Sequence, residues 1–125
     1  MAKERNFPAV FAELKSILQR YAPHLKVTDD GAEGYTLYGA FSPKYKQEVY
    51  FGGAQIKKNY VSFYLMPVYM YPELSNGISE RLSKRRQGKS CFNFTAIDAD
   101  SFKELASLTE KGFERFKQEN LVKES

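Results

Sequence analysis

Apolar residues in the first part of the chain recur at spacings of three and four, which is the pattern of an amphipathic helix. Asn6 has a side chain suited to cap the start of that helix, and Pro8 is tolerated in its first turn. Pro23 ends the pattern, because proline cannot continue a helix. We predict a surface helix over a core, and its apolar stripe contains Phe7, Val10, Phe11, Leu14, Ile17, Leu18 and Tyr21.

The pattern then changes to aromatic and β-branched runs separated by turn residues, which predicts strands. A short strand is expected in LKVT, and a second over residues 35–41 after the turn DDGAEG. The strongest signal is QEVYFGGAQIKKNYVSFYLMPV, in which we expect residues 47–56 to pair with residues 60–66 as a hairpin. The Gly52-Gly53 pair indicates a bulge or a close backbone approach.

Shorter elements are expected after Pro67, which ends or bends the second hairpin strand. PELS is typical of one helical turn. GISERLSKRR predicts a short helix with Ile78 and Leu82 facing inward and Gly88 as its stop. KSCFNFTA then predicts a fifth strand.

A second long helix is predicted in DADSFKELASLTEKGFERFKQEN, with Asp98 or Asp100 as its cap. Gly112 inside it indicates close packing, and we expect the chain from Asn120 onward to fray. The order of elements predicts an α+β fold, in which an antiparallel sheet of about five strands carries the N-terminal and C-terminal helices on one face. The buried stripe of the second helix contains Phe102, Leu105, Leu108, Phe113 and Phe116.

Composition narrows the class of protein. The 125 residues, of which 42% are hydrophobic, are expected to form one domain with its core between about residues 7 and 117. One Cys and one His exclude an intramolecular disulfide and a structural zinc site of about four ligands. The first residues have no apolar signal segment, and YLMPVYMY is too short to span a bilayer, so we expect a soluble cytoplasmic protein.

Alternation along the strands separates two faces of the predicted sheet. Phe, Val and Leu positions form the natural core under the helices. The other face is amphipathic, because tyrosines have aromatic bodies and polar tips. It is predicted either to bind a ligand or simply to cover a wet sheet, and its proposed ligand-binding residues are Tyr38, Tyr50, Tyr60, Tyr64 and Asn93, beside Cys91.

Catalytic groups do not assemble in the sequence. His24 and Cys91 each lack a nearby partner, and Asp98 and Asp100 are better explained as helix caps than as a catalytic pair. We therefore expect no enzyme here, although residues that are distant in the sequence can still converge in the fold.

A basic stretch precedes the predicted fifth strand, and its cations are Lys84, Arg85, Arg86 and Lys89. GKS ends a phosphate-cradle motif, but that motif needs a glycine where this chain has Ser83, and it opens a helix instead of a strand. We exclude that motif. Two interpretations stay open: the cations complement the end of a helix dipole, or they bind nucleic acid or another anionic partner, which the net charge of +4 allows.

The same stretch resembles a known family. GKSCFNF before the helix DSFKELASLTEKGFERF, together with GAEGYTLYGAF and VYFGGAQIKKNYVSFYLMPV, is similar to YdhG-like domains over residues 7–117. The resemblance implies a small cytoplasmic α+β protein, and one branch of the family is a frataxin-like iron chaperone. If iron is bound, the best acidic cluster is Asp29, Asp30 and Glu33; the alternative is a solvated turn.

From these observations we expect a non-enzymatic binding or adaptor domain whose partner is a protein or a small molecule. Iron binding and nucleic-acid binding are the alternatives. A homodimer through an exposed edge of the predicted hairpin is a further expectation, because unpaired edges can pair with a second copy.

Overall fold

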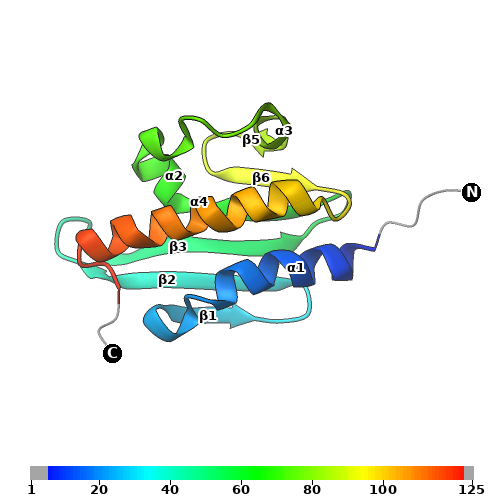
Figure 1. Cartoon of the computed structure of the whole chain (residues 1–125). Coiled ribbons are helices and arrows are strands. Elements are labelled where there is room, and N and C mark those ends of the chain that lie inside the picture. The colour runs from blue at the N-terminus through cyan, green and yellow to red at the C-terminus, as the bar shows by residue number, and fades with distance from the viewer. Residues whose placement is uncertain (1–5, 123–125) are drawn as a thin grey trace, which may run out of the picture.

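The structure of the protein is a computed structural model that describes residues 6–122. Six strands form one antiparallel sheet in the order β1-β2-β3-β4-β6-β5. Helices α1 (Phe7–Gln19) and α4 (Ala99–Gln118) lie across one face of that sheet (Figure 1). The predicted α+β architecture is confirmed. The strands are β1 (Lys26–Asp30), β2 (Gly34–Ser42), β3 (Gln47–Ile56), β4 (Val61–Leu65), β5 (Arg86–Gln87) and β6 (Cys91–Phe94).

Both long helices begin where the sequence predicts. The side chain of Asn6 accepts a hydrogen bond from the Ala9 amide at 3.1 Å, and Asp98 accepts one from the Ser101 amide at 3.3 Å. Each helix buries its apolar stripe against the sheet, and burying one large apolar side chain stabilises the fold by about 1.5–3 kcal/mol. The largest side chains that are fully buried include Phe51, Phe63, Phe92, Phe94 and Phe116.

Short helical segments connect the strands. They are η1 (Ala22–His24), α2 (Met66–Met70), η2 (Pro72–Ser75) and α3 (Glu80–Ser83). Pro67 does end the strand as predicted, but it also lies in the first turn of α2, where its missing N–H is not needed. A Cβ at Gly112 would approach the Pro67 ring to 2.8 Å, so the predicted close packing at Gly112 is confirmed.

The prediction that the helix in GISERLSKRR continues to Gly88 is wrong. Helix α3 ends at Ser83, and Arg86 and Gln87 pair with Phe92 and Cys91 of β6. Leu82 is the last buried apolar residue of that helical pattern, so a longer helix would have no further apolar side chain to bury. Gly88, at a φ of +73°, lies in the turn between β5 and β6.

The prediction of fraying from Asn120 is also wrong as far as residue 122. Asn120 adopts a left-handed conformation, and the next amide, that of Leu121, donates to the Phe116 carbonyl at 2.8 Å. Leu121 is only 4% exposed, and its carbonyl accepts a hydrogen bond from the Ala40 amide of β2 at 2.6 Å. The turn after α4 is therefore docked on the sheet, and we name residues 119–122 the C-terminal turn.

None of the helices within residues 6–122 combines the length and the apolar character that a membrane span requires.

Candidate functional site

Helices α1 and α4 leave the opposite face of the sheet uncovered (Figure 1). The strand register places polar and aromatic residues on that opposite face. Residues directly opposite each other in antiparallel strands point to the same face, so the register defines rows across the sheet. One row is Gln55, Ser62 and Asn93, and the next is Gly53, Tyr64 and Cys91. A third row pairs Tyr38 with Tyr50. We name this surface the tyrosine face and define it by Tyr38, Tyr50, Gln55, Ser62, Tyr64, Cys91 and Asn93.

A β-bulge keeps Tyr50 on this face. Leu37 pairs with Gly52, whereas the next residue of β2, Tyr38, pairs with Tyr50, so Phe51 is the extra residue. Phe51 is fully buried in the core, and Gly52 also faces the helices, because a Cβ there would contact Leu18 of α1. The sequence predicted a bulge or a close backbone approach at Gly52-Gly53. The structure places the bulge one residue earlier. It confirms the close approach, because a Cβ at Gly52 would lie 2.6 Å from the Tyr64 carbonyl oxygen and one at Gly53 would lie 2.7 Å from that of Tyr35.

Glycine at position 53 makes room for the Tyr50 ring. A Cβ at Gly53 would come within 2.9 Å of the Tyr50 hydroxyl, so the tyrosine side chain extends over the glycine. Tyr50 also packs edge to face against Tyr38, with ring centroids 5.3 Å apart and an interplanar angle of 68°. The rings therefore form a connected aromatic surface rather than isolated side chains.

Two groups of the tyrosine face, Tyr50 and Cys91, have raised pKa values. Burial raises the pKa of Tyr50 well above its usual range, and the neighbouring Tyr64, Tyr38 and Cys91 raise it further. Burial also raises the pKa of the Cys91 thiol, against smaller lowering effects of Ser62 and Lys57. Neither group is a nucleophile or a general base near neutral pH.

Hydrogen-bonding capacity on the tyrosine face is unevenly used. Asn93 Oδ1 accepts from the Ser62 hydroxyl at 2.7 Å and from Cys91 Sγ at 3.3 Å. The Nδ2 group of Asn93 and the hydroxyls of three tyrosines make no hydrogen bond within residues 6–122; these tyrosines are Tyr38, Tyr50 and Tyr64. All four side chains are half-buried. This arrangement can hold and orient a ligand that supplies hydrogen-bond acceptors.

Tyr60 is separate from these rows. The strand that was expected to begin at Tyr60 begins at Val61, and the Lys57 amide donates to the Tyr60 carbonyl at 2.7 Å to close the hairpin turn. Tyr60 is 37% exposed at that turn. The alternation of residues along a strand does not show where strand pairing stops. The strand predicted over residues 60–66 was therefore longer than β4.

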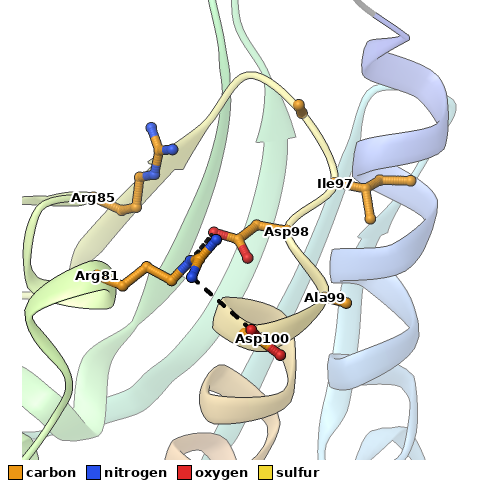
Figure 2. Close-up of a pocket in the computed structure, with 7 residues that line it drawn as sticks. Arg81, Arg85, Ile97, Asp98, Ala99 and Asp100 are labelled. Atoms are coloured by element: carbon orange, nitrogen blue, oxygen red, sulfur yellow. Dashed lines mark hydrogen bonds and ion pairs between the residues drawn. The ribbon is translucent and has the colours of Figure 1, made fainter.

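The four basic residues around β5 differ in their exposure to solvent. Lys84, Arg85 and Lys89 are exposed, whereas Arg86 is half-buried and its Nη2 donates to the Lys89 carbonyl at 2.6 Å. The adjacent hollow of about 430 Å³ is lined by Arg81, Arg85 and the start of α4 (Figure 2). Arg81 Nε already contacts Asp98 Oδ2 at 3.0 Å, so carboxylates offset much of the positive charge there.

The three candidate metal ligands are not brought together. Asp29 pairs with Thr36 and Asp30 with Tyr35, so their side chains leave opposite faces of the sheet. Asp30 contacts Lys15 Nζ of α1 at 2.8 Å. Within residues 6–122, no group of three His, Cys, Asp or Glu side chains is placed to hold a metal ion.

The structure adds two residues that the sequence did not single out. Lys26 of β1 and Glu48 of β3 form an ion pair at 3.2 Å across the intervening strand β2. The pair lies beside Tyr38, at a hollow of about 210 Å³. The two residues are 22 positions apart and carry no local motif, so only the strand order could have revealed them.

No protein-family model matches the chain, no curated protein matches it, and no solved structure matches it.

Proposed function

We propose that the chain is a non-enzymatic binding domain and that the tyrosine face holds a small molecule. The observation that carries this proposal is the set of unused hydrogen-bonding groups on Tyr38, Tyr50, Tyr64 and Asn93. They are half-buried on the side of the sheet that α1 and α4 leave free. None of these four groups is a buried atom without a partner, so water reaches each of them and a ligand binds by replacing that water.

Binding is favoured over catalysis by the chemistry of two groups on the tyrosine face, Tyr50 and Cys91. The pKa values of Tyr50 and Cys91 are both raised, so a phenol and a thiol are presented where an enzyme would need a base or an anionic nucleophile. Asn93 and Ser62 orient each other through their 2.7 Å hydrogen bond. The site is preorganised for recognition.

The resemblance to YdhG-like domains agrees with a small binding protein. Its iron-chaperone branch is less well supported, because Asp29 and Asp30 point to opposite faces. Nucleic-acid binding through Lys84 and Arg85 is less well supported as well, because the carboxylates of Asp98 and Asp100 lie at the same hollow. Both alternatives become outcomes of the test below.

The test is a titration followed by amide chemical shifts, with a set of planar heteroaromatic fragments, a short single-stranded oligonucleotide and Fe²⁺ as separate probes. We expect fragments to shift amides of β3, β4 and β6 in a saturable manner. Tyr64→Phe removes only the hydroxyl and should weaken fragment binding roughly 2- to 10-fold. Tyr69→Phe is the matched control, because Tyr69 is an exposed tyrosine of α2 outside the tyrosine face.

The proposal fails if fragments bind with equal affinity to the Tyr64→Phe variant and the native protein. It also fails if only the oligonucleotide or Fe²⁺ produces saturable shifts.

A further inference from the structure

A small hollow opens at the edge of the tyrosine face, where the pairing of β2 with β3 is interrupted. Tyr38 pairs with Tyr50 and Phe41 with Glu48, so Gly39 and Ala40 together stand opposite Val49. The Ala40 amide bonds instead to the C-terminal turn. The hollow of about 210 Å³ at this irregularity is lined by Leu25, Lys26, Tyr38, Gly39, Ala40 and Glu48.

The hollow combines apolar walls with one ion pair. Leu25, Ala40 and the Tyr38 ring supply carbon surface. Lys26 Nζ donates to Glu48 Oε1 at 3.3 Å and to Oε2 at 3.2 Å. The two side chains are 56% and 44% exposed, so this pair is solvated and opens at small cost.

The ring of Tyr38 connects the hollow to the tyrosine face. Tyr38 lines the hollow, and its ring packs edge to face on Tyr50 at 5.3 Å. In strand register, Lys26 pairs with Tyr38, which pairs with Tyr50, so the three residues form one continuous row. A ligand on the tyrosine face can therefore extend along this row to the ammonium group of Lys26.

The side chains along this row can donate hydrogen bonds to a ligand that carries acceptor atoms. The hydroxyl groups of Tyr38 and Tyr50 each carry one O–H donor. Lys26 adds an ammonium group with donors only, and its present partner is a solvated carboxylate. A ligand carboxylate can replace that partner without leaving a cation unpaired.

We propose that the hollow is the subsite that selects a small aromatic carboxylate, with the ring against Tyr38 and the carboxylate on Lys26 in place of Glu48. This inference rests on the proposed function of the tyrosine face and specifies its ligand class. Recognition by Lys26 gives a charge-assisted hydrogen bond, which is stronger than a neutral one. Glu48 competes with the ligand for the same ammonium group.

The test is a benzoate titration of the full chain followed by amide chemical shifts, with benzylamine as the probe of opposite charge. Lys26→Ala should weaken benzoate binding roughly 1.5- to 5-fold, because an ion pair to a half-exposed lysine is lost. Glu48→Gln should strengthen it roughly 1.5- to 5-fold, because the competing carboxylate is removed. Lys44→Ala is the control for a loss of positive charge at an exposed site.

Two results would overturn the inference: benzoate affinity that is unchanged in Lys26→Ala, or weaker binding of benzoate in Glu48→Gln. Preferential binding of benzylamine would also overturn it, because Glu48 would then be the recognising group. The proposed function is judged separately by Tyr64→Phe with the neutral fragments. Fragments that respond to Tyr64→Phe while benzoate ignores Lys26→Ala would leave the tyrosine face intact and remove only this subsite.

Discussion

Gly39 is the position at which one added methyl group should detach the C-terminal turn. A Cβ built on Gly39 would collide with the Leu121 carbonyl oxygen and would lie 3.0 Å from Cε2 of Phe116. The first contact is with backbone, which cannot rotate away as a flexible side chain can. In Gly39→Ala the turn therefore has to leave its place on β2.

The loss of stability in Gly39→Ala can be estimated from the contacts that the C-terminal turn makes with the sheet. Undocking loses the 2.6 Å hydrogen bond between Ala40 and Leu121, which contributes about 0.5–1.5 kcal/mol. It also exposes Leu121, now only 4% exposed, at a cost of about 1.5–3 kcal/mol. We expect Gly39→Ala to lower the free energy of unfolding by about 2–4 kcal/mol. Detachment sets the upper limit, because the rest of the sheet can remain folded without the turn.

The assay is urea unfolding followed by circular dichroism, with a double-mutant cycle. Gly31→Ala is the matched control, because its added Cβ would meet no atom closer than 3.9 Å. Leu121→Ala alone should be costly, but it should add little in the Gly39→Ala background, where Leu121 is already exposed. Additive losses in the double variant, or a Gly39→Ala protein within about 0.5 kcal/mol of the native stability, would refute this reasoning.

Three further predictions concern a cap, a thiol and the bulge. Partial burial raises the pKa of Asp98, but hydrogen bonds from Ser101 and Arg81 lower it overall. The ionised carboxylate therefore stabilises the fold fully above its unfolded pKa of about 3.9. That stabilisation is lost as the pH falls through the lower pKa of the folded state. Asp98→Ala should cost about 1 kcal/mol at pH 7, and urea unfolding should show the difference from the native protein shrinking below pH 4. Cys91 should react with iodoacetamide at pH 7.5 more slowly than free cysteine, because its pKa is raised; a rate equal to that of free cysteine would contradict this placement. Gly53→Ala should cost about 1–3 kcal/mol, because its Cβ would lie 2.7 Å from the Tyr35 carbonyl oxygen. The same Cβ would lie 2.9 Å from the Tyr50 hydroxyl and should displace that side chain, so an unchanged tyrosine signal in near-ultraviolet circular dichroism would count against this prediction.

Local patterns were sufficient for the helices and for part of the tyrosine face; Tyr60 lies outside that face, and Tyr50 belongs to it because of a bulge. The stripes of α1 and α4 and the caps Asn6 and Asp98 depend on residues within one or two turns of each other. Alternation within a strand likewise placed Tyr64 and Asn93 on the face opposite the core, because side chains of a strand alternate over two residues.

Features that depend on strand order could not be read from the sequence. The Lys26–Glu48 pair exists because β1 and β3 both flank β2, and strand β5 exists because β6 offers an edge to Arg86 and Gln87. The docked C-terminal turn depends on a gap in β2–β3 pairing at Gly39 and Ala40. In each case the stabilising contact is with a residue that is distant in the sequence, so local helix or strand propensity does not predict it.

The docking of the C-terminal turn also has a consequence for when the chain can fold during synthesis. Leu121 and Phe116 close the core over β2, a strand that leaves the ribosome some 80 residues earlier in the chain. The central strand β4 likewise waits for β6, its neighbour in the sheet. A nascent chain that has emerged only as far as β4 exposes unpaired strand edges and apolar surface, which favours chaperone capture or aggregation. Nascent chains arrested after residue 100 should therefore be protease-sensitive, whereas protection should appear once α4 has cleared the exit tunnel and should increase further when residue 121 follows.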